Sequence, residues 1–118
     1  MNPILDVRNL SIDYVANGTP LHAVEDISFK NKKGCSLALV GESGCGKTTI
    51  GMAILQLIRP TSGDVFFDEV NLTTLDSEAM RKIRRQMQII FQDPYSSLNP
   101  RIKAGEAIRE PMKVHGLY

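Results

Sequence analysis

Apolar and polar residues alternate through the first quarter of the chain, a pattern that predicts antiparallel strands. Residues 5–14 (LDVRNLSIDY) alternate loosely, and residues 24–29 (VEDISF) alternate again. Between these segments, residues 16–20 (ANGTP) carry the turn dipeptide Asn-Gly, and residues 31–34 form a second turn. We therefore expect the chain to open with antiparallel β-structure.

The pattern changes at residues 36–40 (SLALV), which form a continuous apolar run. Such a run predicts a strand that is covered on both faces. From residue 47 to residue 59 the apolar positions recur at helical spacing, and Pro60 should end that helix. A short strand at residues 64–67 follows the turn after Pro60.

The last third of the chain predicts two helices with a buried strand between them. Asp76 can cap a helix over residues 77–86, and the basic cluster near its end is interpreted as a solvated face in preference to a nucleic-acid site. Residues 87–91 (MQIIF) read as the buried strand, and residues 105–114 as a helix limited by Pro111. This order predicts an α/β fold with an antiparallel β appendage.

Composition narrows the function classes. The 118 residues include 14 basic and 13 acidic side chains, so no global field favours nucleic acid or an anionic membrane. No segment approaches the roughly 20 apolar residues that span a bilayer, and the polar start excludes a signal-peptide core. A cytosolic protein is the expectation. Cys35 and Cys45 form no disulfide framework or metal-ligand pattern.

Residues 41–48 (GESGCGKT) match the phosphate-binding pattern G-x-x-x-x-G-K-[ST] in full. The motif follows an expected buried strand and opens an expected helix, which is the context that the pattern requires. Its glycines let the backbone turn so that successive N–H groups can form an anion nest: Gly41, Gly44 and Gly46. The start of the following helix adds free N–H groups and a positive dipole end.

The other residues of the motif have separate expected roles. Lys47 supplies a full positive charge to the β- and γ-phosphates, and the Thr48 hydroxyl can take one position around Mg²⁺. Thr49 has no role in the bare motif but is counted with the nucleotide-binding residues. Three residues are expected to contribute mainly backbone groups: Glu42, Ser43 and Cys45. The motif explains binding better than turnover, since hydrolysis also needs a group that orients water.

A second motif, FQDPYSSLNPR at residues 91–101, follows the strand expected at 87–91. Together with GESGCGKTT and with EPMKVHGL at residues 110–117, it resembles the ATP-binding subunit of dipeptide and oligopeptide ABC importers. The resemblance covers nearly the whole chain. It implies a P-loop NTPase fold, that of the ABC nucleotide-binding domain, with residues 1–94 in the ATP-binding core and residues 95–118 at the start of the helical subdomain.

The resemblance also implies roles for individual residues. Tyr14 resembles the aromatic residue that stacks on adenine, and Gln92 resembles the Q-loop glutamine that approaches Mg²⁺ and the attacking water. Taken alone, a strand tyrosine or a glutamine after a strand is more often structural. ATP and Mg²⁺ are the implied cofactors, Thr48 and Gln92 the implied metal ligands, and Lys47 and Gln92 the implied catalytic residues.

The implied partners are a second ATP-binding subunit, transmembrane permease subunits that meet the loop after Gln92, and indirectly a peptide-binding protein; no nucleic acid is expected. The implied location is the cytoplasmic face of the cell membrane, where the subunit would be peripheral. The loop at residues 95–101 could alternatively serve a binding module that only docks on a permease. A different P-loop enzyme, such as a small-molecule kinase, does not account for the Gln92 segment.

Elements that the family places beyond the Q-loop do not occur in the sequence: an LSGGQ-like loop, the second carboxylate motif and the switch histidine. His22 and His115 do not lie where that histidine would be. The chain is therefore expected to be truncated and inactive alone as an ATPase. The alternative hypothesis is a nucleotide-binding fragment or gene remnant that has no hydrolytic activity.

Overall fold

The computed structural model describes residues 2–41, 46–92 and 99–117. The chain divides into two compact units, Met1–Asp76 and Ser77–Tyr118. The first unit contains the whole β-sheet and one α-helix, and the second contains two α-helices.

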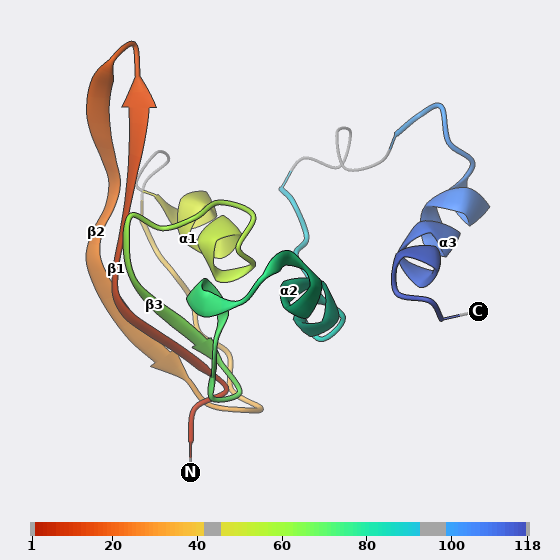
Figure 1. The fold of residues 1–118 in the computed structure, drawn as a ribbon, viewed down its shortest axis with the longest axis horizontal. Coiled ribbons are helices and arrows are strands. Elements are labelled where there is room, and N and C mark those ends of the chain that lie inside the picture. The colour runs from red at the N-terminus through yellow and green to blue at the C-terminus, as the bar shows by residue number, and fades with distance from the viewer. Residues whose placement is uncertain (1, 42–45, 93–98, 118) are drawn as a thin grey trace. The chain divides into compact units, whose positions relative to one another are not determined.

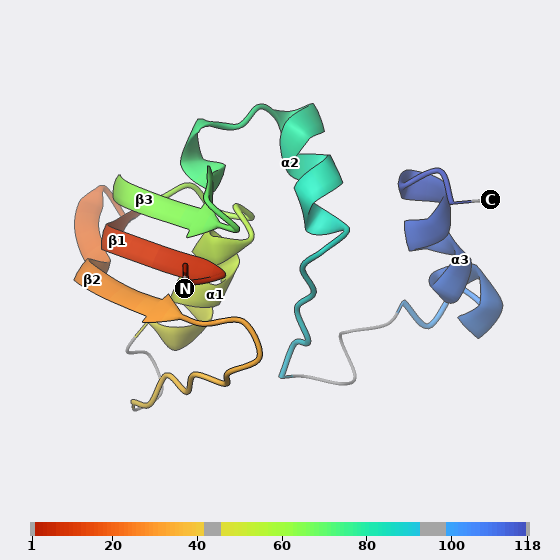
Figure 2. The same ribbon diagram turned by 90° about the horizontal axis from the view of Figure 1, so that it is seen from below.

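The first unit is built on a four-stranded sheet with the strand order β2-β1-β3-β4, in which every neighbouring pair is antiparallel. Helix α1 (Lys47–Ile54) lies against one face of this sheet (Figures 1 and 2). A short 3₁₀ helix, Leu72–Thr74, follows the last strand. The strands are β1 (Leu5–Ala16), β2 (Thr19–Asn31), β3 (Ser62–Phe67) and β4 (Val70–Asn71).

The register of the long β1–β2 hairpin shifts in a region where backbone N–H groups donate to side-chain oxygens and not to the carbonyl oxygens of the neighbouring strand. Asn9 and Asp26 take left-handed backbone conformations, with φ of 50° and 47°, and the Asn9 Nδ2 donates to Asp26 Oδ1 at 2.9 Å. The backbone N–H of Asn9 donates to Ser28 Oγ at 2.8 Å, and that of Asp26 to Ser11 Oγ at 2.9 Å. Asn and Asp tolerate this conformation better than other non-glycine residues, so the sequence permits the bulges.

Gly63 brings β3 close to this irregular part of β1. Its φ is 98°, and a Cβ at this position would lie 2.3 Å from the backbone oxygen of Asn9. Only a residue without a side chain fits such an approach.

The core of the first unit lies between the sheet and α1. Apolar side chains from the three longer strands alternate into it, and α1 adds its buried face. Burying a side chain of this kind stabilises the fold by roughly 1.5–3 kcal/mol. The buried residues of this core are Val7, Leu10, Ile12, Val24, Ile50, Ala53, Leu55, Val65 and Leu72.

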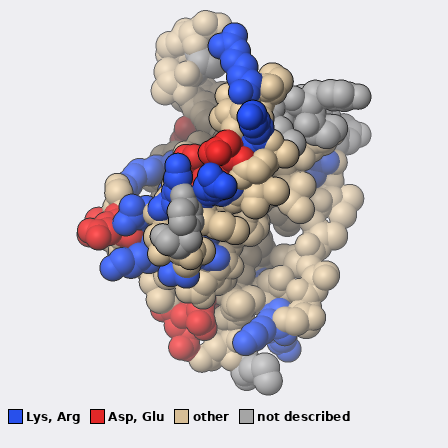
Figure 3. All heavy atoms as spheres, turned by 90° about the vertical axis from the view of Figure 1, so that its right-hand side faces the viewer, with Lys and Arg blue, Asp and Glu red and all other residues tan. Residues whose placement is uncertain are grey.

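The second unit contains α2 (Ser77–Arg84) and α3 (Ala104–Val114). Met80 is the buried residue of α2, whereas no residue of α3 is buried. On the face of the molecule shown in Figure 3, Lys and Arg side chains form several separate groups with Asp and Glu among them. Within the described ranges, no helix is long and apolar enough to cross a membrane.

Two sequence predictions of buried strands are wrong in this structure. Residues 36–40 and 87–91 form no strand, and several of their apolar side chains lie exposed: Val40 by 93% and Ile90 by 96%. Among the described residues, no strand pairs with either run, since the sheet contains only β1 to β4. A strand that is covered on both faces depends on neighbours of this kind, which local patterning cannot supply.

Helix α1 ends at Ile54, five residues before the predicted boundary at residue 59. Gln56 takes a left-handed φ of 57°. The N–H of Leu57 donates to the Met52 oxygen at 2.9 Å and the N–H of Gln56 to the Ala53 oxygen at 3.0 Å. These two bonds form a Schellman motif, which closes the helix before Pro60 can act.

The remaining predictions differ from the structure in smaller ways. The strand expected at 24–29 lies within the longer β2, and the helix expected to reach residue 86 ends at Arg84. The strand expected at 64–67 begins two residues earlier, at Ser62. The short strand β4 and the 3₁₀ helix were not predicted.

Candidate phosphate-binding site

The candidate loop joins residue 41 to the start of α1, and the structure describes its two ends. Gly41 precedes the loop, and Gly46 with Lys47 follows it. The Lys47 Nζ donates a hydrogen bond back to the Gly41 carbonyl oxygen. This bond ties the end of the loop to its beginning. Four predicted site residues lie outside the described residues: Glu42, Ser43, Gly44 and Cys45.

Gly46 is required at its position for two independent reasons. It takes a left-handed φ of 97°, which costs a residue with a Cβ free energy. A Cβ there would also lie 2.6 Å from the Ala23 backbone oxygen and 3.1 Å from Val24 Cγ2, both on β2. The loop therefore enters α1 in close contact with the sheet, and this contact positions the helix N-terminus.

The N-terminus of α1 offers backbone donors without a competing acid. The first helical hydrogen bond that reaches Gly46 comes from Ile50, at 2.9 Å. The N–H groups of the preceding helical residues therefore have no partner within the helix. Among the described residues, no side chain caps this end, and no acidic residue lies in the first turn of α1. Lys47 and Thr48 are exposed there, so an anion can reach both side chains and the helix dipole.

Tyr14 lies near the end of β1 and contacts the same helix. Its hydroxyl is 3.4 Å from the Thr49 Oγ1, and either oxygen can donate. The side chain of Tyr14 is partly accessible, so its ring can offer a face to a planar ligand. The structure thus brings together a strand residue and a helix residue that are 35 positions apart in the sequence.

A neighbouring ion pair was not found by sequence reasoning. The antiparallel register places His22 opposite Asp13, and the His22 Nδ1 lies 2.6 Å from Asp13 Oδ1. The hydrogen bond to Asp13, and then the charge of the same carboxylate, raise the pKa of His22 above its ordinary value of 6.5. The only signal for this pair is the register of the hairpin, which the sequence pattern does not specify.

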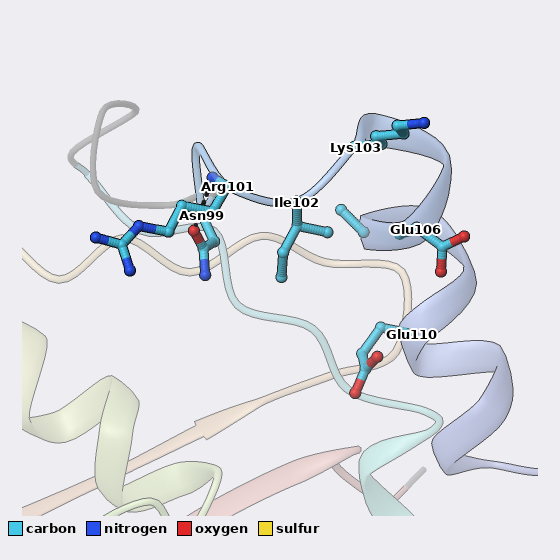
Figure 4. Close-up of a pocket in the computed structure, with 7 residues that line it drawn as sticks. Asn99, Arg101, Ile102, Lys103, Glu106 and Glu110 are labelled. Atoms are coloured by element: carbon cyan, nitrogen blue, oxygen red, sulfur yellow. Dashed lines mark hydrogen bonds between the residues drawn. The ribbon is translucent and has the colours of Figure 1, made fainter.

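Gln92 belongs to the second unit, whereas the loop and α1 belong to the first. Its side chain is exposed, and residues 93–98, which follow it, lie outside the described residues. Beyond this gap, a pocket of about 860 Å³ lies between the loop at 99–103 and α3 (Figure 4). Figure 4 shows Arg101 and Asn99 on the loop and the two glutamates on α3. The pocket is lined by Asn99, Arg101, Ile102, Lys103, Glu106, Ala107 and Glu110.

The described residues contain no group of three His, Cys, Asp or Glu side chains that could jointly hold a metal ion. A Mg²⁺ ion that arrives with a nucleotide does not need such a group, since phosphate oxygens and water supply most of its ligands. Thr48, exposed in the first turn of α1, offers one hydroxyl oxygen at the right end of the helix. The residues present therefore fit a magnesium nucleotide better than a resident metal centre.

Comparison with known proteins gives one matching family model. The model of the ABC transporter family matches residues 24–115, which include the loop, α1 and the Gln92 segment. Solved structures agree with this match. A dimeric ABC transporter cassette, MJ0796, has a TM-score of 0.79 and 28% identity, and the alignment covers 92% of this chain and 47% of the cassette. The same cassette in a post-hydrolysis state with ADP and Pi has a TM-score of 0.78.

Curated relatives are more similar in sequence. A Brucella ovis protein, provisionally named a peptide import ATP-binding protein, is 44% identical over 98% of this chain. The glutathione import ATP-binding protein GsiA of Pectobacterium atrosepticum is 45% identical, also over 98% of this chain. The chain spans 36% of the length of the Brucella relative and 20% of the length of GsiA.

Proposed function

Because this chain belongs to the ABC transporter family, we propose that it supplies the ATP-binding part of a subunit that powers import of dipeptides or oligopeptides. The names of its relatives, which refer to peptide and glutathione import, support this choice of cargo. The observation that carries the proposal is the uncapped N-terminus of α1, with Lys47 and Thr48 exposed beside the loop.

Each group at the site would act on the nucleotide in a defined way. The backbone N–H groups of the loop and those of the first turn of α1 would donate to phosphate oxygens. The Lys47 ammonium would leave the Gly41 oxygen and bind the β- and γ-phosphates. Tyr14, already held near the helix by Thr49, would stack on the adenine ring. Such stacking is worth about 1–3 kcal/mol per base in single-strand binders.

Residues of the loop outside the described part complete the proposed site. Glu42, Ser43, Gly44 and Cys45 would contribute their backbone N–H groups. Thr48 and Gln92 would hold Mg²⁺, which supplies charge neutralisation on the phosphates when it is bound with ATP. Gln92 would in addition orient the attacking water, since an amide oxygen accepts and an amide nitrogen donates.

The partners belong to the proposal as well. A second ATP-binding subunit would face this one, as in the dimeric cassette that it resembles. The loop that follows Gln92, together with the pocket between residues 99–103 and α3, would meet a permease subunit at the cytoplasmic face of the membrane. Residues 1–94 would form the ATP-binding core, and residues 95–118 the beginning of the helical subdomain.

A second candidate is a chain that binds nucleotide but does not hydrolyse it alone. The observation that favours it is the sequence itself, which contains neither an LSGGQ-like loop nor the second carboxylate motif. Phosphoryl transfer to water needs groups beyond the phosphate cradle. Under this candidate, the 118-residue chain saturates with MgATP but releases negligible phosphate, and turnover that depends on Lys47 would contradict it.

The binding proposal is tested by titrating the chain with MgATP in a calorimeter and comparing Lys47→Ala with the parent. A charge-assisted hydrogen bond is worth about 1.5–3 kcal/mol, so the variant should bind at least about tenfold more weakly. Lys33→Ala is the matched control, because Lys33 is an exposed lysine in the turn before the loop. Equal affinities in the parent and Lys47→Ala would refute the assignment of the phosphate site.

A further inference from the structure

The first unit contains a pocket whose chemistry is unrelated to the phosphate loop. It is a pocket of about 240 Å³ between the N-terminal segment, β1 and the β3–β4 turn. Its floor is a buried carboxylate, its walls are two half-buried rings, and its rim is formed by exposed polar side chains. The lining residues are Asn2, Pro3, Asp6, Arg8, Phe66 and Glu69.

The floor of the pocket is Asp6, whose side chain is only 7% exposed. Arg8 directs two of its donor nitrogens to one oxygen of this carboxylate: Nε lies 3.0 Å and Nη2 2.8 Å from Oδ2. The other oxygen, Oδ1, is buried and has no hydrogen-bond partner among the described residues. A buried carboxylate oxygen without a donor is unfavourable, so the site is incomplete as it stands.

The rim adds charge to this floor. Glu69 accepts a hydrogen bond from the Asn2 side chain, and the Arg8 guanidinium lies 4.4 Å from the centre of the Phe66 ring. Two carboxylates and one guanidinium leave the pocket with a net charge of about −1. Arg8 remains protonated, since the hydrogen bond to Asp6 raises its already high pKa.

We propose that this pocket binds a primary ammonium group, which donates to Asp6 Oδ1 while its alkyl stem lies against Pro3 and Phe66. The ammonium can belong to a small alkylamine or to a lysine side chain of a partner protein. A metal ion does not suit the site, because no three His, Cys, Asp or Glu side chains meet in the described part of the chain and Arg8 adds positive charge. The proposal is independent of the function proposed for the phosphate loop.

The side chains at the rim are exposed, while Asp6 Oδ1 itself is buried. The Arg8 side chain is 56% exposed and Asn2 is also exposed, so an ammonium that reaches Oδ1 would have to displace rim side chains and not core residues. Among the described residues, Lys30 is a candidate for an internal ammonium, because the β1–β2 register pairs it with Asp6. Lys30 does not line the pocket, so the proposal assigns the site to an external ammonium.

The test is a titration of the 118-residue chain, labelled with ¹³C at aspartate, with n-butylammonium followed by NMR. We expect a saturable shift of the Asp6 carboxyl carbon. Two control compounds test which feature of the ligand the site recognises. Tetramethylammonium carries the charge but has no N–H donors, and n-butanol has the alkyl stem but no charge. Neither should reproduce the shift. The same titration with N-acetyl-lysine methylamide separates the two sources, because a lysine partner predicts at least tenfold tighter binding of this compound than of n-butylammonium.

Variants decide whether Asp6 is the acceptor. Asp6→Asn should weaken binding of n-butylammonium at least tenfold, and Glu69→Gln should weaken it by a smaller factor. Asp68→Asn is the matched control, since Asp68 is an exposed carboxylate that does not line the pocket. Glu69→Gln changes an exposed side chain, so it remains informative if Asp6→Asn fails to fold.

Three results would overturn the proposal. The first is the absence of any saturable shift in the parent chain, which would leave solvent as the partner of Asp6 Oδ1. The second is an equal response to tetramethylammonium. The third concerns Lys30→Gln measured without added amine. If this substitution alone shifts the Asp6 carboxyl carbon as much as n-butylammonium should shift it in the parent, Lys30 is the partner of Asp6 Oδ1.

Discussion

Gly46 offers the sharpest test of how the phosphate loop is built. Gly46→Ala adds one Cβ at a residue whose φ is 97°. That Cβ would lie 2.6 Å from the Ala23 backbone oxygen, closer than real Cβ contacts, and 3.1 Å from Val24 Cγ2. The oxygen belongs to β2 and cannot turn aside as a flexible side chain could, so either the strand or the start of α1 must move.

Two costs add in this variant. A left-handed backbone conformation costs a non-glycine residue roughly 1–2 kcal/mol. Forcing one extra carbon into a packed contact costs about 1–3 kcal/mol. The free energy of unfolding should therefore fall by about 2–5 kcal/mol, a large share of the 5–15 kcal/mol typical of a small domain.

Urea denaturation followed by circular dichroism measures this loss. The matched control is Gly51→Ala, because Gly51 lies in the interior of α1 with an ordinary backbone conformation, and a Cβ added there would meet no atom within 4 Å. The control should stabilise the chain by about 0.5–1 kcal/mol through helix propensity. A Gly46→Ala chain as stable as the parent, or a Gly51→Ala chain that loses as much stability, would refute the reasoning.

Two further predictions concern the strands. Asp13→Asn should lower the pKa of His22 toward 6.5 in an NMR titration, because the hydrogen bond that raises it weakens. In the parent, the His22–Asp13 pair contributes its full stabilisation at pH values below 6.5, and this contribution is lost as the pH rises through the raised pKa of His22 in the folded state. A His22 pKa that is unchanged in Asp13→Asn would contradict this prediction. Glu69→Gly should raise the melting temperature, since Glu69 has a φ of 69° in the two-residue β3–β4 turn and glycine relieves about 1 kcal/mol there. Glu69→Ala keeps the Cβ and should give no such gain.

Local patterns predicted the elements that are stabilised by near neighbours. The alternation in residues 5–14 and the Asn-Gly turn correspond to the β1–β2 hairpin, whose strands pair with each other directly. The helices expected from residues 47, 77 and 105 begin at Lys47, Ser77 and Ala104. Each of these elements makes its defining hydrogen bonds within itself or with an adjacent segment, so its sequence contains most of the information.

The predictions of two covered strands were wrong because such strands depend on distant segments of the chain. Residues 36–40 and 87–91 have the composition of central strands, but a central strand is stable only where other strands pair with it and helices cover it. The described residues supply neither for these runs, and Leu39 and Phe91 are 41% and 49% exposed. Their composition indicated that these segments can form strands, but whether they do so depends on pairing with neighbouring strands.

In the candidate site, too, the sequence predicted local features but not the contacts between distant segments. The motif at residues 41–48 predicted a helix start near Lys47, and α1 begins there, with Gly46 in a left-handed conformation before it. No sequence pattern indicated that the Ala23 carbonyl would lie close to Gly46, or that the Thr49 hydroxyl would contact that of Tyr14. Both contacts join segments more than 20 residues apart, so they depend on how the hairpin bends over α1. The roles of individual residues toward ATP stay predictions.

If Lys47 binds phosphate as we propose, its bond to Gly41 makes nucleotide binding an exchange of partners for the Lys47 ammonium. An ammonium that already has an internal acceptor must release it before it can contact phosphate, so measured affinity reports the difference between two interactions. A substitution that weakened only the internal bond should therefore raise the measured affinity, because less binding free energy would be lost when Lys47 leaves the Gly41 oxygen.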